Sequence, residues 1–532
     1  MSYAIDFGTS NTVITRWNAA TAQAETIKLS GLSQQLGNNP PLIPSLVYVE
    51  DASQDKVLVG QMVRDRGLDL SNDTRFFRSF KRGIGAEIQG FLPELDEKPI
   101  TFEQVGEWFL TALINHLKAQ SQTPESLILT VPVDSFEAYR HWLSNVCQSW
   151  SVEQVRILDE PTAAALGYGT TDESLLLVVD FGGGTIDLSL VQLDLGNHNQ
   201  PQNQGFILKW GDKLLGNSSG QKAKLARVIA KAGRNLGGSD LDYWLVNYFA
   251  QTQGLPRSSL TIRLAERLKI QLSSQMQATE VYFNDETLES YELELDRDRF
   301  EKILEEQQFF VQLDELMIQV LQQARRNGIE TTDIDAVLLV GGSIQIPAVQ
   351  TWIRQYFDAT KIRCARPFEA IALGALQLAQ GIEVKDFLYH SYGIRYWNRR
   401  KNCHSWHPII KSGQPYPMSY PVELTLGASV ESQPSMELVI GELGAESGGT
   451  EVYFDGDRLV MRSVEMGTTV VQPLNDKDGA RTIAQLDPLG YPGSDRVKLQ
   501  FWVDEQRFLR LKVEDLLIQA TLLNNQIVAQ LS

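Results

Sequence analysis

The segment VVDFGGGTIDLSL at residues 178–190 places three glycines between two aspartates, with apolar runs on both sides. The apolar runs predict two buried strands, and the glycines predict the turn that joins them. Glycine N–H groups can converge on phosphate oxygens because no Cβ stands in the way. Carboxylates repel a bare phosphate, so Asp180 and Asp187 indicate a divalent cation between protein and phosphate. Taken alone, the motif fits a tight hairpin with solvated aspartates equally well.

Three more glycine turns accompany this one. DFGTSNT (6–12) repeats the design, since Asp6 precedes a strand–turn–strand pattern whose turn offers N–H and hydroxyl groups. LLVGGSIQIP (338–347) places two glycines between a strand and a helix, where N–H groups and the helix dipole favour an anion. NLGGSD (235–240) is a further glycine turn before a helix, and no Walker-type GxxxxGK loop occurs. Two Asp–Gly–Thr hairpins far apart in the chain predict two similar lobes that face one nucleotide.

Length, charge and cysteine content limit the class of protein. A chain of 532 residues predicts two or three domains. The net charge of −18 argues against binding to nucleic acid or to an anionic membrane. Three scattered cysteines (Cys147, Cys364 and Cys403) suit a reducing compartment. We find no signal peptide and no apolar run long enough to span a membrane, so we expect a cytoplasmic location.

The pattern of elements changes along the chain. Strands alternate with helices to about residue 382, which predicts an α/β unit. Helical spacing occurs at 101–120, 135–150, 160–169, 239–274 and 298–327. We expect a polar loop with a short basic helix over 198–233. Residues 391–532 contain many Pro and Gly turns and alternating strands, which predicts an all-β domain. Its alternating core positions include Phe501, Val503, Leu509, Leu511 and Val513.

Seven motifs follow one another in the order seen in the actin-like ATPase fold. They are AIDFGTSNTV, FKRGIG, EPTAAALGYG, DFGGGTIDLS, NLGGSDLD, LAERLKIQLSS and VGGSIQIPAVQ. The second, third and sixth resemble the 70-kilodalton heat-shock (DnaK-type) chaperones specifically. The resemblance implies a duplicated, ribonuclease-H-like ATPase domain over 1–382 and a linker over 383–390. It implies an all-β peptide-binding sandwich over 391–532, where PIIKSGQPYP is similar to the family, and we expect no helical lid.

The same resemblance implies ATP or ADP and Mg²⁺ as cofactors and assigns roles to residues. Asp6 and Asp180 would hold hydrated Mg²⁺, Lys81 would meet the γ-phosphate, and Glu160 would polarise the attacking water. Thr185 and Asp187 would orient water or a monovalent cation such as K⁺. The remaining phosphate-binding set is Gly8, Thr9, Ser10, Asn11, Gly182, Gly183, Gly184, Gly237, Gly238, Gly341, Gly342 and Ser343. From the residues alone, Lys81 could be a surface lysine, and Glu160 could be a helix N-terminal acid before a proline.

The nucleoside end departs from the family. Glu266, Lys269 and Ser273 match family residues that touch ribose and adenine, and their spacing places them on one helix face. Read without the resemblance, that face is a solvated polar one. The family's two adenine-stacking arginines correspond to Ile270 and Gln345 here. Losing both predicts weaker or less selective adenine binding.

The leading interpretation is an ATP-hydrolysing, chaperone-like protein whose nucleotide state modulates binding of extended or unfolded polypeptide. The resemblance implies a J-domain co-chaperone and a nucleotide-exchange factor as partners. Pro132 and Arg140 match family positions that pass the nucleotide state to the linker, although a strand-ending proline and a surface arginine fit the sequence better.

Three alternative functions compete with this one. A nucleotide-regulated scaffold for a dedicated partner belongs to a different class. An actin-like filament protein shares two of the motifs, but the added β-domain and FKRGIG argue against it. A sugar kinase shares the ATPase fold, but we identify no sugar site with a catalytic base.

Overall fold

The computed structural model describes residues 1–18, 20–21, 23–37, 39–86, 88–89, 93–120, 122–132, 137–150, 152, 154–169, 174–194, 225–284, 288–377, 388, 391–398, 403–411, 414, 416–418, 420–443, 449–455, 458–464, 471–476, 482–504 and 507–531. The expected linker over 383–390 lies outside these residues, except for Leu388.

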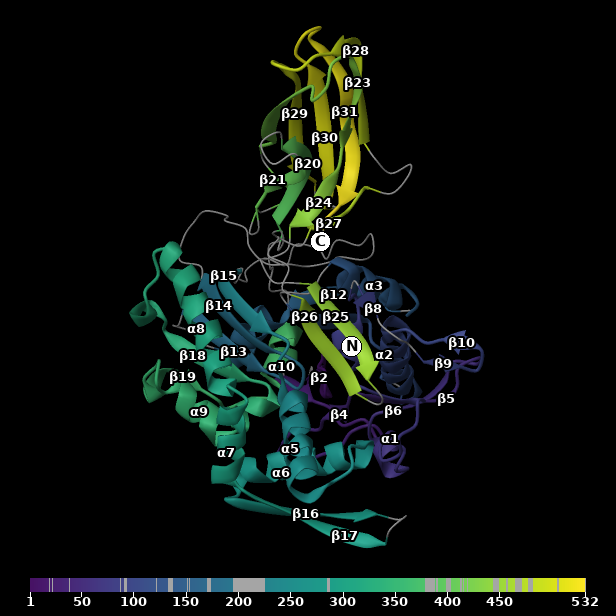
Figure 1. The fold of residues 1–532 in the computed structure, drawn as a ribbon, viewed down its shortest axis with the longest axis vertical. Helices are drawn as coiled ribbons and strands as arrows, with labels where there is room; N and C mark the ends of the chain where they lie inside the picture. The colour runs from purple at the N-terminus through teal and green to yellow at the C-terminus, as the bar shows by residue number, and fades with distance from the viewer. Residues whose placement is uncertain are drawn as a thin grey trace. The chain divides into compact units, whose positions relative to one another are not determined.

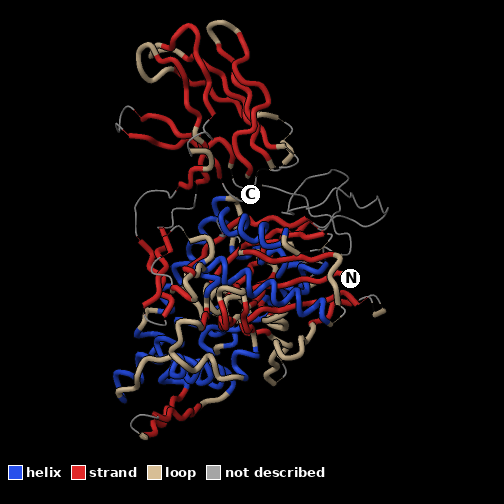
Figure 2. The backbone as a smooth tube through the Cα atoms, turned by 90° about the vertical axis from the view of Figure 1, so that its right-hand side faces the viewer, coloured by secondary structure: helices blue, strands red, loops and turns tan. Residues whose placement is uncertain are grey.

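The described residues form two compact units. The larger contains those of 1–377 together with 451–462, and the smaller contains those of 388–450 and 463–531. Figures 1 and 2 show that the larger unit mixes helices and strands, whereas the described part of the smaller unit is built from strands.

Two five-stranded paths of the same design organise the larger unit. In the first, the order is β12-β11-β1-β2-β3, with β4 (Ile43–Pro44) also pairing to β2. In the second, the order is β19-β18-β13-β14-β15. In both paths the first three strands run parallel and the last two are added antiparallel. The first path comprises β1 (Ser2–Phe7), β2 (Asn11–Asn18), β3 (Gln23–Thr26), β11 (Ser126–Val131) and β12 (Gln154–Asp159). The second comprises β13 (Leu175–Phe181), β14 (Ile186–Asp194), β15 (Leu225–Arg234), β18 (Ala336–Val340) and β19 (Ile362–Arg363).

Helices α4 (Glu160–Tyr168) and α10 (Ala370–Gln377) pack against each other in a core shared with strands of both sheets. Their close crossing depends on small residues. A Cβ built on Gly167 would lie 1.8 Å from the carbonyl oxygen of Ala370, and one on Gly374 would lie 1.8 Å from that of Ala163. Asp159 caps α4 by accepting a 2.8 Å hydrogen bond from the Thr162 N–H. The crossing therefore fixes Glu160, the first residue of α4, relative to both sheets.

Further helices cover the two sheets. In Figure 1, α8 lies along β14 and β15, on which it packs. The helices outside the α4–α10 pair are α1 (Gln61–Asp65), α2 (Phe102–Ala119), α3 (Glu137–Gln148), α5 (Gly238–Gln253), α6 (Ser259–Ser274), α7 (Arg297–Glu306), α8 (Phe309–Arg326) and α9 (Pro347–Ile353), with 3-10 turns η1 (Phe80–Gly83), η2 (Thr331–Asp333), η3 (Gly342–Gln345) and η4 (Ala359–Lys361).

Smaller sheets complete the larger unit. They are β6-β5-β7, β10-β9, β16-β17 and β26-β25-β8. Their strands are β5 (Leu46–Asp51), β6 (Lys56–Val59), β7 (Phe76–Arg78), β8 (Ile88–Gln89), β9 (Glu94–Leu95), β10 (Lys98–Pro99), β16 (Gln277–Asn284), β17 (Glu289–Asp296), β25 (Gly449–Asp455) and β26 (Arg458–Val464). The β16–β17 hairpin was not predicted; the exposed face of β17 is acidic, whereas that of β16 carries Val281 and Phe283.

One expectation about the larger unit is wrong. The short basic helix predicted within 198–233 is replaced, over Leu225–Arg234, by strand β15, which pairs antiparallel with β14. Lys and Ala favour helices locally, but pairing with a neighbouring strand overrides that weak preference. The rest of that segment, 198–224, lies outside the described residues.

The smaller unit is a sandwich around one apolar core. Two four-stranded sheets, β21-β20-β24-β27 and β22-β29-β30-β31, and the pair β23-β28 contribute to it. The five alternating positions predicted from the sequence are fully buried. The strands are β20 (Ser391–Asn398), β21 (Cys403–Ile410), β22 (Val422–Gly427), β23 (Gln433–Leu438), β24 (Ile440–Leu443), β27 (Val471–Pro473), β28 (Thr482–Gly490), β29 (Asp495–Val503), β30 (Phe508–Asp515) and β31 (Ala520–Gln530).

Among the residues described here, no helix combines the length and apolarity that a membrane-spanning segment needs.

Candidate functional site

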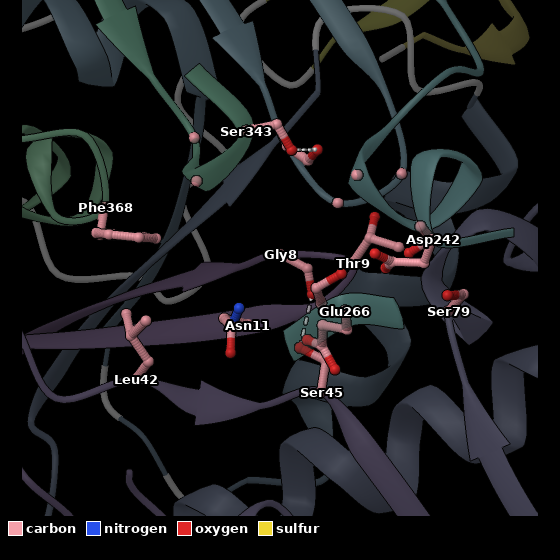
Figure 3. Close-up of a pocket in the computed structure, with 18 of the residues that line it drawn as sticks. Gly8, Thr9, Asn11, Leu42, Ser45, Ser79, Asp242, Glu266, Ser343 and Phe368 are labelled. Atoms are coloured by element: carbon pink, nitrogen blue, oxygen red, sulfur yellow. Dashed lines mark hydrogen bonds between the residues drawn. The ribbon is translucent and has the colours of Figure 1, made fainter. Parts of the chain in front are cut away.

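A cavity of about 250 Å³ in the larger unit brings together the glycine turns predicted from the sequence (Figure 3). Of the predicted site residues, all but Asp187 and Gly237 line it. Those that line it are Asp6, Gly8, Thr9, Ser10, Asn11, Lys81, Glu160, Asp180, Gly182, Gly183, Gly184, Thr185, Gly238, Glu266, Lys269, Ile270, Ser273, Gly341, Gly342, Ser343 and Gln345. We call the part around the two hairpin turns, 8–11 and 182–185, the turn end. We call the part lined by Glu266, Lys269, Ile270 and Ser273 of α6 the helix end.

At the turn end the two hairpin turns touch. A Cβ on Gly183 would lie 1.9 Å from the Ser10 Oγ, and one on Gly184 would lie 2.6 Å from the Thr9 Oγ1. Glycine at these positions lets the two backbones approach, as the sequence pattern predicts. Both turns therefore present backbone N–H groups and hydroxyls to the same space.

The other two glycine turns support the β13–β14 turn. The carbonyl oxygen of Gly182 accepts hydrogen bonds from the Gly238 N–H and the Ser343 Oγ, each at 3.0 Å. The Gly183 carbonyl accepts from the Ser239 N–H at 2.9 Å. Figure 3 shows the Ser343 bond, and also the one by which the Ser45 Oγ holds the Gly8 carbonyl on the facing turn at 2.7 Å. The backbone of the turn end is thus fixed from several elements at once.

Lys81 of η1 and Glu160 of α4 form an ion pair at the turn end. The Lys81 Nζ lies 3.1 Å from the Glu160 Oε1, and the two side chains are only 10% and 12% exposed. The ammonium also lies 5.5 Å from the centre of the Phe7 ring. Burial alone would lower the pKa of Lys81, but the Glu160 carboxylate and its neighbours raise it above the ordinary value. Lys81 is therefore a permanently charged group inside the cavity rather than a surface lysine.

Asp6 and Asp180 stand where a negative charge is costly. Burial and the nearby Glu160 carboxylate raise the pKa of Asp6 to about 7, while Lys81 and a 2.9 Å hydrogen bond from the Thr130 Oγ1 oppose the rise. Burial, Glu160 and Asp187 raise the pKa of Asp180 well above its ordinary value. A cation placed among these carboxylates would relieve this repulsion, so the donor set fits Mg²⁺. Within the described part of the chain, no group of three or more His, Cys, Asp or Glu residues is arranged to hold a metal ion.

The two predicted residues outside the cavity lie directly beside it. Asp187 is paired with Asp180 across the β13–β14 ladder and lines a second, much smaller cavity, together with Pro132. Gly237 packs on the turn: a Cβ there would lie 2.4 Å from the Gly183 carbonyl carbon. The expectation that Arg140 is a surface residue is wrong, because it is 2% exposed. Its place on α3 gives no local signal of burial, since the packing partners come from distant segments.

At the helix end, the polar side chains of α6 are paired with residues from elsewhere. Glu266 forms an ion pair with Arg64 of α1, in which nitrogen and oxygen are 3.0 Å apart. Lys269 forms another with Asp242 of α5, at a nitrogen–oxygen distance of 2.7 Å. Burial raises the pKa of Glu266, but Arg64, Lys269 and Arg78 together outweigh burial and hold that pKa below its ordinary value. Burial raises the pKa of Asp242 to about 6 although Lys269 opposes it. These side chains are not the solvated polar face that the sequence alone favoured.

Several cavity residues were not predicted. They include Gln34, Arg64, Asp69, Arg78 and Phe368, which come from segments without a motif, and Asp242, which ends the motif NLGGSDLD. Figure 3 places Phe368 and Leu42 on one side of the cavity, away from Asp242 and Glu266. Arg64 lies 202 residues from its partner Glu266, so no local signal could have joined them.

Comparisons with a family model and with individual proteins both find similarity to Hsp70-type chaperones. The Hsp70 protein family model matches residues 90–200 and 225–391, more than half of the chain. The chaperone protein dnaK1 of Synechocystis sp. is 28% identical over 389 residues, covering 65% of this chain and 50% of the relative. A chaperone protein HscA homolog of Pseudoalteromonas atlantica is 26% identical, with coverages of 70% and 57%. The chaperone protein DnaK of Thermotoga petrophila is 28% identical, with coverages of 70% and 58%. This chain thus spans between half and three fifths of the length of these relatives.

Proposed function

Because the chain belongs to the Hsp70 family, we propose that its larger unit binds ATP or ADP with Mg²⁺ and hydrolyses the γ-phosphate of ATP. The nucleotide state then modulates the binding of extended or unfolded polypeptide to the smaller unit. The observation that carries this proposal is the turn end itself. Two glycine hairpins meet there beside two buried aspartates and a buried Lys81–Glu160 pair.

Each group at the turn end has a task in this proposal. The N–H groups and hydroxyls of both turns bind the phosphates, and Asp6 and Asp180 hold the metal through water. Mg²⁺ supplies charge neutralisation along the phosphates when it is bound. Lys81 contacts the γ-phosphate and places the attacking water, which Glu160 polarises. Thr185 and Asp187 orient that water or a monovalent cation.

Adenosine recognition is assigned to the helix end. Glu266, Lys269 and Ser273 contact the ribose and the base, while Ile270 and Gln345 line the cavity where the family places arginines. Ile270 is 45% exposed, so its side chain is available to make apolar contact with a base. We propose weaker base selectivity than in relatives that keep the arginines.

The smaller unit would bind polypeptide as an added strand, using main-chain hydrogen bonds and apolar contacts. A J-domain co-chaperone and a nucleotide-exchange factor would act on this cycle of nucleotide binding, hydrolysis and release.

The test measures affinity for Mg-ATP by calorimetry and turnover by phosphate release, in the full chain and in Lys81→Ala. Removing one preorganised charge should lower turnover by about 10²- to 10³-fold. Because the change also leaves the buried Glu160 carboxylate without its partner, turnover is compared at a temperature where circular dichroism shows both proteins fully folded. The matched control is Lys56→Ala, because Lys56 is 66% exposed and pairs with Glu50 at the surface. This control should keep wild-type turnover.

The same assay is repeated with an extended apolar peptide and with a J-domain protein. Stimulation by either supports a chaperone cycle. ATP binding with a turnover that neither peptide nor J-domain protein stimulates would favour the alternative function, a nucleotide-regulated scaffold for a dedicated partner. Failure of the full chain to bind Mg-ATP would refute the proposal as a whole.

A further inference from the structure

Behind the turn end lies a second cavity of about 10 Å³, which is room for about one water molecule. Its lining comes from the end of β11, from the start of α4 and from strands β13, β14 and β15. The lining residues are Pro132, Glu160, Pro161, Val178, Asp180, Asp187, Ser189, Lys231 and Ala232. Three of these are carboxylates, and Lys231 of β15 is the one positively charged residue among them.

Strand register explains how Lys231 reaches this place. Across the three antiparallel strands, Asp180 pairs with Asp187 and Asp187 with Gly233. Two residues further along β14, Ser189 pairs with Lys231. Side chains two residues apart on a strand share a face, so Lys231 projects from the same face of the sheet as Asp187. The two are diagonal neighbours, within reach of a long side chain.

Gly233 gives the lysine room to turn toward the aspartate. It stands directly opposite Asp187 in the ladder and carries no side chain. At this position Gly233 therefore adds no side chain that would compete with Lys231 for the place beside Asp187.

Carboxylates outnumber positively charged side chains around the turn end and the small cavity, so a positive charge in addition to Lys81 would stabilise them. Four carboxylates, those of Asp6, Glu160, Asp180 and Asp187, lie around the turn end and the small cavity behind it. The ammonium of Lys81 is engaged with Glu160. A positive charge on the Asp187 side would balance the remaining carboxylates.

We infer that Lys231 is a positioning residue that supplies this charge from within the chain, in the place of a diffusible monovalent cation. The inference rests on the proposed ATP hydrolysis and refines one part of it. Lys231 lines this cavity, which has room for about one water molecule, so its ammonium would take the place beside Asp187 that a K⁺ ion would need. Turnover should consequently be independent of K⁺.

The experiment compares the full chain with three variants in KCl, NaCl and choline chloride at equal ionic strength. Wild type and Lys231→Arg should turn over ATP at similar rates in all three salts. Lys231→Ala should lose about tenfold or more in NaCl and choline. It should recover in KCl, because truncation opens space for the ion. Lys231→Met removes the charge but fills the space, so it should lose activity in every salt.

A second readout does not depend on catalysis. In Mg-ADP, exchanging NaCl for KCl should raise the melting temperature of Lys231→Ala and leave that of wild type and of Lys56→Ala unchanged. Wild-type turnover that requires K⁺ would overturn the inference. So would a Lys231→Ala protein that matches wild type in every salt. If the full chain does not bind Mg-ATP, the proposed function fails, while the melting experiment in KCl and NaCl without nucleotide still tests the charge balance.

Discussion

The turn end and the helix end of the cavity are built in different ways. At the turn end, backbone approach and buried charge fix the geometry: glycines of facing turns touch, and an ion pair with little exposure lies beside buried aspartates. At the helix end, side chains from three separate elements pair with one another, as in Arg64–Glu266 and Lys269–Asp242. We therefore expect substitutions at the turn end to disturb its geometry. At the helix end, we expect one side chain to be replaceable by another.

This difference follows from the two chemistries that the ends would serve. Phosphates are highly charged, so they need donors and cations fixed before binding. A base is neutral and flat, and general apolar or stacking contact can hold it. The sequence resemblance agrees with this division, because it implies family residues at the turn end and departures from the family at Ile270 and Gln345. The predictions below test whether the division is real.

The largest expected effect is on turnover and concerns Glu160. Glu160→Gln keeps the shape of the side chain but removes the charge that pairs with Lys81. Phosphate-release assays should show a loss of about 10²- to 10³-fold. Because the two groups act as a pair, adding Lys81→Ala should cost much less than the product of the single losses. Fully multiplicative losses would show that the groups act independently.

Much of the turn end could be predicted from local sequence. Glycine clusters between apolar strands permit close backbone approach, and all four predicted turns meet at one site. The predicted fold class, an actin-like α/β ATPase fold followed by an all-β sandwich, is confirmed by the structure and by the family match.

The remaining features depend on contacts between distant segments. The Arg64–Glu266 pair joins α1 to α6, and nothing near either residue indicates the other. Lys231 was assigned to a helix, where its relation to Asp187 is invisible. Once the segment is treated as a strand, alternation places the two on one face. Tertiary pairing, rather than local preference, decided both cases.

The second prediction concerns pH and the buried charge of the turn end. The pKa of Asp6 is raised from 3.8 to about 7, so the folded state holds its proton more tightly than the unfolded chain does. Asp6 therefore contributes stability that is fully present below pH 4 and is lost as pH rises through about 7. Without nucleotide or Mg²⁺, the melting temperature should fall over this range, by about several degrees.

Asp6→Asn should flatten this part of the pH dependence, because the amide does not titrate. The control Asp65→Asn, at an exposed position on α1, should keep it. Binding of Mg-ADP should also flatten the slope, since a bound cation favours the ionised carboxylate. A wild-type melting temperature that stays constant from pH 4 to pH 7 would contradict the charge burial described here.

The third prediction tests close packing at the turn end. Gly237→Ala would place a Cβ 2.4 Å from backbone atoms of Gly183 and Gly184, so the turn must shift. Such overpacking costs about 1–3 kcal/mol, and ATP affinity should fall with it. Gly182→Ala is the matched control, because its nearest contact would be at an ordinary 3.8 Å. Equal melting temperatures for the two variants would mean that the turns are not held together as tightly as the geometry indicates.

The smallest expected effect is a gain in affinity at the helix end. Ile270→Arg places a guanidinium at the position where the sequence resemblance implies an adenine-stacking arginine. A desolvated cation–π contact is worth about 1–2 kcal/mol, so ATP should bind roughly 5- to 30-fold more tightly in calorimetry. Val281→Arg adds the same charge at a site on β16 that is 59% exposed and outside the cavity, and it should leave ATP affinity unchanged.

Inorganic tripolyphosphate separates base contact from general attraction. It carries the phosphates without a base, so the Ile270→Arg variant should bind it as wild type does. If tripolyphosphate binding rises as much as ATP binding, the new arginine acts through charge on the turn end. The two ends would then not be independent, and the contrast between a rigid phosphate site and an exchangeable base site would have to be abandoned.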